Sequence, residues 1–284
     1  MNILVLGSGG MLGHLTTIYL REKGHNVKDL SFPKAAFNDS FVCNVCDTQK
    51  LAQFIDYHEF DMIINCIALL IRESEQNKSQ AVYLNSYFPH WLEKKYENTK
   101  TKIVQVSTDG VFGSGKAPFD ENAPQMNTSF YARSKSLGEL DNTKDLTIRS
   151  SYFGPDMNEG GKGLLNWFLS QKGEVKGFKK AIFTGVTSLE FAKFVDTVAF
   201  NSSGIYNLGA SSPISKYDLL SAFKKRLQLD EINIIADSEY SVDTSVLTSR
   251  KDILYNQINY DIMINELCDY IENHKEYYPH YNLK

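Results

Sequence analysis

The chain has 284 residues, of which 42% are hydrophobic and 23% are charged, and its formal net charge at pH 7 is −4. This length and composition allow one or two domains with a large hydrophobic core. The charge offers no basic surface for nucleic acid, and no apolar stretch approaches the ~20 residues that span a bilayer. A strand is expected directly after Met1 and Asn2, which leaves no room for a signal peptide and predicts a cytoplasmic protein.

The chain opens with the pattern of a strand, a glycine turn and a helix. Residues 3–6 are apolar and β-prone, as in a parallel strand that is buried on both faces. Glycines follow at once, and residues 16–23 then fit a helix. In dinucleotide-binding folds such glycines permit a tight turn, close approach of the backbone to a pyrophosphate, and close helix packing. The predicted cofactor-binding residues of this turn are Gly7, Gly10, Met11, Leu12 and Gly13.

The end of the second strand-like run bears on the choice of cofactor. An acidic residue there would bond the ribose 2′-hydroxyl of NADH and repel the 2′-phosphate of NADPH. Ser31 takes that place in the sequence and Lys34 follows it, which favours NADPH. If the strand ended two residues earlier, Asp29 would select NADH instead.

The cysteines do not form a metal-binding pattern. Cys43 and Cys46 have the spacing of one half of a zinc site, but Cys66 and Cys268 are scattered and complete no ligand set. We therefore expect no metal, and we interpret the cysteines as small buried side chains.

Apolar, strand-like runs recur at residues 3–6, 27–30, 62–66, 103–106 and 146–148, with room for a crossover helix between them. This alternation predicts an α/β fold with a doubly wound parallel Rossmann sheet. Ligands of such a sheet bind at the carboxyl ends of the strands.

After residue 150 the regular alternation ends. We expect residues 1–150 to form an NAD(P)-binding Rossmann domain, to which residues 183–208 return with a late strand at 205–208. Residues 151–182 and 209–284 are expected to form a smaller, interleaved C-terminal substrate-binding lobe.

Three side chains that can handle protons lie in the middle of the chain. Thr108 follows the run at 103–106, and its hydroxyl can hold a substrate oxygen. Tyr131 and Lys135 are four residues apart, so on a helix they share one face. A free tyrosine titrates near ~10, and we expect the lysine to lower the pKa of the phenol toward the range where it exchanges protons at neutral pH.

Taken together, these motifs resemble the extended short-chain dehydrogenase/reductase superfamily and, within it, the dTDP-4-dehydrorhamnose reductase (RmlD-like) family. The resemblance rests on Gly7-x-x-Gly10-x-x-Gly13, Ser107-Thr108-Asp109, and Tyr131-x-x-x-Lys135 followed by Gly138-Glu139. It implies NADPH-dependent reduction of the 4-keto group of a nucleotide-activated 6-deoxyhexose, for the synthesis of a cell-surface polysaccharide precursor. The superfamily also implies a homodimer.

The resemblance assigns roles to individual residues. Thr108, Tyr131 and Lys135 form the catalytic set, in which Tyr131 protonates the oxygen and Lys135 also holds the nicotinamide ribose. Asp109 and Tyr152 face the sugar. The residues implied beside the cofactor are Asn44 and Val45 at the adenine, Asn65 and Ala68, and Asn85 as either a relay or a structural residue.

Two positions depart from the rhamnose enzymes and leave the sugar and its nucleotide carrier open. Gly110 stands where those enzymes have tyrosine, and Tyr152 where they have tryptophan. Related 4,6-dehydratases have an Asp-Glu pair after the threonine, because the elimination of water needs an additional acid and base. Gly110 disfavours dehydration, so reduction and 4-epimerisation remain, of which we favour reduction. A subunit that binds the dinucleotide without turnover is a further alternative, against which the intact catalytic set argues.

Overall fold

The computed structural model describes residues 1–113, 115–281 and 283. Its centre is a seven-stranded sheet in the order β10-β6-β5-β4-β1-β2-β3, in which neighbouring strands run parallel. The strands are β1 (Asn2–Leu6), β2 (Asn26–Ser31), β3 (Phe41–Val42), β4 (Met62–Asn65), β5 (Lys102–Val106), β6 (Leu146–Arg149) and β10 (Gly204–Asn207). The chain runs outward from β1 to β3 and then returns to β4 on the other side of β1, which creates a switch point where such sheets bind ligands. The predicted doubly wound parallel sheet is confirmed.

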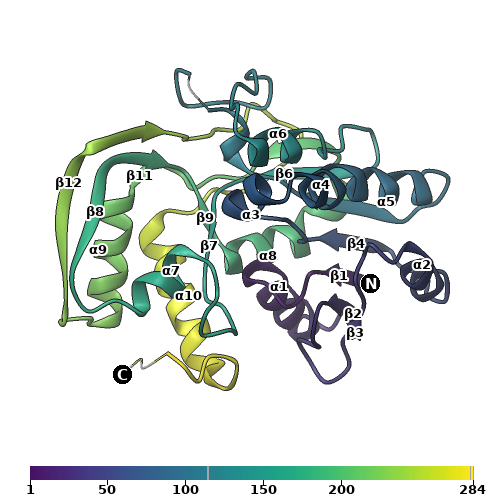
Figure 1. Ribbon diagram of the computed structural model, residues 1–284, viewed down its shortest axis with the longest axis horizontal. Coiled ribbons are helices and arrows are strands. Elements are labelled where there is room, and N and C mark those ends of the chain that lie inside the picture. The colour runs from purple at the N-terminus through teal and green to yellow at the C-terminus, as the bar shows by residue number, and fades with distance from the viewer. Residues whose placement is uncertain (114, 282, 284) are drawn as a thin grey trace.

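Helices cover both faces of this sheet. The longer ones are α1 (Met11–Glu22), α2 (Thr48–Asp56), α5 (Phe88–Tyr96) and α8 (Ser188–Thr197). Shorter segments are α3 (Ile71–Gln76), α4 (Lys78–Ala81), the π-helical η1 (Val82–Tyr87), the 3-10 turns η2 (Asp109–Val111) and η3 (Ala199–Asn201), and α6 (Phe130–Ser136). In Figure 1, α1 and α8 lie to the left of the strands β1 and β4, whereas α2 lies to their right.

Alternate side chains of the central strands enter two separate cores. On β1, Ile3 and Val5 belong to the hydrophobic cluster that includes α1 and α8, whereas Leu4 and Leu6 belong to the cluster that includes α2 and α5. Successive side chains of a strand point to opposite faces, so a strand that is covered on both sides must be apolar throughout. This requirement explains why the short apolar runs of the sequence predicted these strands.

A second, three-stranded sheet lies beside the first, at the left of Figure 1, in the order β11-β8-β12. Its strands are β8 (Gly173–Phe183), β11 (Ile214–Ser215) and β12 (Ile232–Asp243), and the nearby helices are α7 (Leu164–Leu169), α9 (Lys216–Leu227) and α10 (Tyr260–Asn273), followed by the turn η4 (Lys275–Tyr277). We call these three strands and three helices the C-terminal lobe. The short parallel strands β7 (Tyr152–Phe153) and β9 (Val186–Thr187) pair with each other. The late strand expected at 205–208 is β10, which joins the central sheet beside β6.

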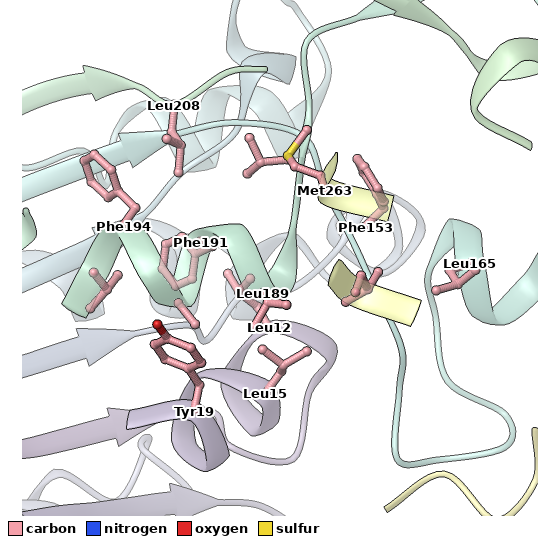
Figure 2. Close-up of a cluster of buried hydrophobic side chains, with 14 of the residues drawn as sticks. Leu12, Leu15, Tyr19, Phe153, Leu165, Leu189, Phe191, Phe194, Leu208 and Met263 are labelled. Atoms are coloured by element: carbon pink, nitrogen blue, oxygen red, sulfur yellow. The ribbon is translucent and has the colours of Figure 1, made fainter. Parts of the chain in front are cut away.

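One continuous core connects the central sheet to the C-terminal lobe. Figure 2 shows the buried side chains of α1 and α8 that meet in it: Leu12, Leu15, Tyr19, Leu189, Phe191 and Phe194. The same cluster contains Phe153 of β7, Leu165 of α7 and Met263 of α10. Complete burial of a large apolar side chain contributes about 1.5–3 kcal/mol. This shared core therefore fixes the position of the lobe beside the carboxyl ends of the strands.

Candidate active site

A cavity of about 570 Å³ lies where the central sheet meets the C-terminal lobe. Four of its walls are segments that follow strands of the sheet: 10–13 after β1, 66 and 68–70 after β4, 106–108 at the end of β5, and 150–152 after β6. The other lining residues are Glu73, Tyr131, Lys135, Asp156, Lys162 and Gly163. The cavity thus lies at the carboxyl ends of the parallel strands, where sheets of this kind bind their ligands.

The glycine turn after β1 fits the phosphates of a dinucleotide. Gly7 has φ +86°, a conformation that favours glycine, and a Cβ on Gly13 would lie 2.2 Å from the carbonyl oxygen of Gly7. Helix α1 therefore packs closer to the turn than a residue with a side chain at position 13 would permit. Gly10 provides the N-cap without a side-chain hydrogen bond, so the N–H groups of the first helical turn are left for a ligand at the cavity. Such a helix N-terminus attracts anions.

Thr108 and Tyr131 meet at the opposite wall. Thr108 follows β5, and its Oγ1 accepts a hydrogen bond from Gly110 N at 3.0 Å. Tyr131 lies in the first turn of α6, which Ser129 caps by accepting from Ala132 N. Burial raises the pKa of Tyr131 to about 12, and a hydrogen bond with the Thr108 side chain opposes this shift. At neutral pH the phenol is therefore protonated.

Lys135 also lines the cavity, but its ammonium contacts the main chain. Its Nζ donates a hydrogen bond to the Val106 carbonyl oxygen at 2.6 Å, and burial lowers the pKa of Lys135 to about 8. The expected lowering of the pKa of Tyr131 by Lys135 is not found in this structure, because burial raises this pKa and the side chains that act on the phenol are Thr108 and Asp109, not Lys135. The lysine is aimed at the end of β5, where the ribose of a dinucleotide is expected.

The predicted residues divide into two groups. The cavity is lined by Gly10, Met11, Leu12, Gly13, Ala68, Thr108, Tyr131, Lys135 and Tyr152. The cavity lining does not include Gly7, Ser31, Asn44, Val45, Asn65, Asn85 and Asp109. The roles that the resemblance assigns to these outlying residues stay predictions.

Two of the outlying asparagines support the loop that carries Ala68. Asn65 Nδ2 donates to Gln105 Oε1 at 2.8 Å, and its Oδ1 accepts from Ile67 N at 3.2 Å. Asn85 Oδ1 accepts from Leu69 N at 2.8 Å. Both side chains are fully buried, so they act on the cavity through the loop.

The outlying residues near β2 and β3 also bond to the protein. Ser31 Oγ donates to the Lys34 carbonyl at 2.8 Å, and Asn44 Oδ1 accepts from Cys46 N at 3.0 Å. Val45 is buried, and its carbonyl accepts from the hydroxyl of Tyr83.

The earlier end of the second strand that would expose Asp29 is not observed. Strand β2 continues to Ser31, and Asp29 is buried within it, paired with Arg21 at 2.9 Å. Its Oδ2 also accepts a hydrogen bond from Ser40 Oγ at 2.6 Å. The carboxylate is therefore engaged by the protein.

Several charged residues at the cavity were not predicted from the sequence. Lys162 of the loop before α7 forms an ion pair with Glu73 of α3, which joins the lobe side of the cavity to the sheet side. Asp156 also lines the cavity. The glycine-rich composition of residues 158–163 was the only signal for this loop, and no spacing marked Glu73.

A C-terminal segment supports both the glycine turn and this loop. His14 Nδ1 donates to the Gly10 carbonyl at 2.9 Å, so in the neutral ring Nε2 accepts from the Tyr278 hydroxyl at 3.0 Å. The Tyr281 hydroxyl accepts from Asp156 N at 2.9 Å and donates to Asn166 Oδ1 at 2.7 Å. Two tyrosines from one segment thus hold two walls of the cavity.

The buried His14 makes stability depend on pH. Burial lowers the pKa of His14 from 6.5 to about 4, so the unfolded chain binds this proton more readily than the folded chain. The stabilisation is complete above pH ~6.5 and decreases as the pH falls toward ~4, by about 3 kcal/mol in all. We expect the free energy of unfolding of the wild type to fall by about that much more than that of His14→Gln between these pH values. Urea unfolding at both pH values measures the difference, and parallel losses in the two proteins would refute it.

Within the described residues, no group of three or more His, Cys, Asp or Glu side chains is placed to hold a metal ion. No helix in the described part of the chain is long and apolar enough to cross a bilayer.

Comparison with known proteins agrees with this geometry. A family model described as the RmlD substrate binding domain matches residues 1–251. The spore coat polysaccharide biosynthesis protein SpsK of Bacillus subtilis (strain 168) is 26% identical over 263 residues, which cover 87% of this chain and 89% of that protein.

Solved structures share the fold. The dTDP-4-dehydrorhamnose reductase from Bacillus anthracis str. Ames, in complex with NADP, has a TM-score of 0.77 at 16% identity, and the match covers 95% of this chain and 99% of that one. UDP-glucose 4-epimerase from Thermotoga maritima, with UDP-glucose, also has a TM-score of 0.77 at 16% identity, covering 96% and 99%. At this identity both structures inform only on the fold. The family match extends over most of the sequence, and the chain therefore belongs to the family of the RmlD substrate binding domain.

Proposed function

We propose that this protein is an NADPH-dependent reductase of the 4-keto group of a nucleotide-activated 6-deoxyhexose, and that it serves the synthesis of a cell-surface polysaccharide precursor. The observation that carries this proposal is that Thr108, Tyr131 and Lys135 line one cavity together with the glycine turn. The family match, the polysaccharide role in the name of SpsK, and the NADP complex of the structurally similar reductase support it.

We assign the dinucleotide to residues 1–150 together with 183–208, and the sugar nucleotide to residues 151–182 and 209–284. The cavity supports this division. One part of its lining follows β1, β4 and β5, and another part, which includes Tyr152 and residues 156, 162 and 163, lies between β6 and α7 in the sequence. Tyr152 and Lys162 lie on the second part and are proposed to face the sugar nucleotide.

Each catalytic side chain has a separate task in the proposed reaction. The free N–H groups at the start of α1 bind the pyrophosphate of the dinucleotide. When bound, the nicotinamide supplies the hydride. The Thr108 hydroxyl and the Tyr131 phenol donate hydrogen bonds to the keto oxygen, and Tyr131 releases its proton as that oxygen gains negative charge. Lys135 holds the ribose hydroxyls.

The protonation of Tyr131 favours reduction over oxidation. Because burial raises the pKa of this phenol to about 12, the group begins the reaction as an acid, as the protonation of a reduced carbonyl requires. Gly110 next to Thr108 supplies no further acid or base, and a Cβ there would lie 3.2 Å from Thr108 Oγ1. Both features argue against dehydration.

The proposal is tested by following NADPH oxidation with dTDP-, UDP- and GDP-linked 4-keto-6-deoxysugars. Stoichiometric oxidation with a 4-hydroxy sugar as product would establish the reductase. Interconversion of 4-epimers without net oxidation would instead establish an epimerase. Tight NADPH binding with neither reaction would favour a binding subunit.

The preference for NADPH is expected to depend on Lys34. The Ser31 hydroxyl bonds to the carbonyl of Lys34 and holds this exposed lysine beside the end of β2, where a 2′-phosphate is expected. In Lys34→Glu the KM for NADPH should rise by about tenfold with little change for NADH, because the new charge repels only the phosphate. Steady-state kinetics with both cofactors measures the ratio.

Lys100→Glu is the matched control. Lys100 is exposed and precedes β5, so it lies at the amino-terminal ends of the strands, away from the proposed cofactor site. An equal change of the two KM values in Lys34→Glu would place the 2′-phosphate elsewhere.

A further inference from the structure

The Asp109 side chain lies behind the wall of the cavity. Its Oδ2 accepts hydrogen bonds from Ser151 Oγ at 2.7 Å and from Thr244 Oγ1 at 3.1 Å, and its Oδ1 lies 3.3 Å from Thr108 Oγ1. Thr108 and Ser151 belong to the cavity lining, whereas Asp109 is buried and does not. The carboxylate therefore contacts the wall from the protein side.

The three hydroxyl groups around Asp109 come from different parts of the fold. Thr108 follows β5 and Ser151 follows β6, so both lie at the carboxyl ends of the central strands. Thr244 directly follows β12, and its N–H donates to the Ile182 carbonyl of β8 at 2.9 Å. One carboxylate thus connects the proposed catalytic hydroxyl to two strands of the C-terminal lobe.

These contacts restrict the rotation of the Thr108 hydroxyl. It has one hydrogen to donate, while its oxygen already accepts from Gly110 N and the side chain also bonds with Tyr131. Asp109 draws the hydroxyl toward its own side of the wall. The contact with Asp109 is long, at 3.3 Å, so a substrate oxygen in the cavity can take over this hydrogen while the Thr108 side chain keeps the position that Asp109 and Gly110 N give it.

The surroundings of the carboxylate place opposite charge near it. Burial raises the pKa of Asp109, whereas the hydrogen bond from Ser151 and the positive charge of Lys216 oppose that shift. The Lys216 Nζ lies 3.6 Å from the centre of the Phe183 ring, and within the described residues no carboxylate oxygen lies within 4.0 Å of it. Lys216 and the three hydroxyls favour the charged form of Asp109, and hydrogen bonds are stronger when the acceptor is charged.

We propose that Asp109 is a positioning residue: its carboxylate sets the direction of the Thr108 hydroxyl and couples that direction to the C-terminal lobe through Thr244. This inference rests on the proposed reductase function, and it replaces the expectation from resemblance that Asp109 faces the sugar. It makes Thr244, which is absent from the cavity lining, a residue on which turnover depends.

Thr244→Val and Thr244→Ser form a matched pair for the test. Valine has nearly the shape of threonine but lacks the hydroxyl, whereas serine retains it. We expect kcat of Thr244→Val to fall by about tenfold with an unchanged KM for the sugar nucleotide, since one hydrogen bond to a charged acceptor is lost. Thr244→Ser should stay within about twofold of the wild type. Equal kinetics of the two variants, or a rise confined to the KM for the sugar, would overturn the inference.

A second measurement needs no substrate. The Gly110 N–H bonds to Thr108 Oγ1, so its hydrogen exchange reports whether that hydroxyl is held in place. Exchange at Gly110 should accelerate in Thr244→Val but not in Thr244→Ser, while amides of β1 remain unchanged in both. If the wild type reduces no sugar of the panel, the proposed function fails, and exchange at Gly110 still decides the positioning role. Unchanged exchange in Thr244→Val would refute that role even in an active reductase.

Discussion

In the Tyr131→Phe variant, kcat for the reduction of the sugar should fall by about 10²–10⁴-fold, the usual contribution of a positioned acid. Phenylalanine keeps the ring of Tyr131 and removes only the hydroxyl that bonds with Thr108. The cofactor should bind as before, because the glycine turn and Lys135 are unchanged. Steady-state kinetics and a fluorescence titration with NADPH measure the two quantities.

Tyr57→Phe is the control for this experiment, because Tyr57 is 86% exposed and lies outside the cavity lining. It should retain wild-type kcat. A Tyr131→Phe variant that turned over within a few-fold of the wild type would exclude the phenol as the proton donor, whatever the reaction.

The Arg149→Met variant should lose about 3–5 kcal/mol of its free energy of unfolding. Arg149 and Glu139 form a buried, two-pronged ion pair, with Nε–Oε1 at 2.8 Å and Nη2–Oε2 at 2.6 Å. Removal of the guanidinium leaves the Glu139 carboxylate buried, with hydrogen bonds from Ser107 and Gln125 as its remaining polar contacts. Urea denaturation measures the loss.

Two comparisons separate this effect from a general sensitivity to lost ion pairs. Lys94→Met breaks an exposed pair with Glu97, and such pairs are worth only about 0–1 kcal/mol. The double variant Arg149→Met with Glu139→Leu removes both buried charges and should recover part of the stability. If Arg149→Met cost no more than Lys94→Met, the buried pair would not stabilise the fold.

The sequence predicted those parts of the fold that leave a local signature. Residues 3–6 and 103–106 are apolar throughout because both faces of their strands are covered, and these runs became β1 and β5. The long strands β8 and β12 were not predicted. Many of their side chains are exposed, so neither contains the unbroken apolar run that marked the central strands.

The candidate site was predictable to a similar extent. Thr108, Tyr131 and Lys135 could be placed together because the carboxyl ends of parallel strands share an edge. The direction of a side chain could not be predicted in this way. The turn η2 sends the Asp109 carboxylate toward Thr244 rather than the cavity, and that contact joins residues 135 positions apart.

The hydrogen bond between His14 and Tyr278 joins residues that are 264 positions apart. During synthesis the glycine turn leaves the ribosome early, and contacts between distant residues form late. A chain that ended before Tyr278 would contain all seven strands of the central sheet but would lack the hydrogen bond from Tyr278 to His14 behind the glycine turn. A nascent chain should therefore bind the dinucleotide tightly only after synthesis has passed Tyr278. Products of incomplete translation should bind the dinucleotide more weakly.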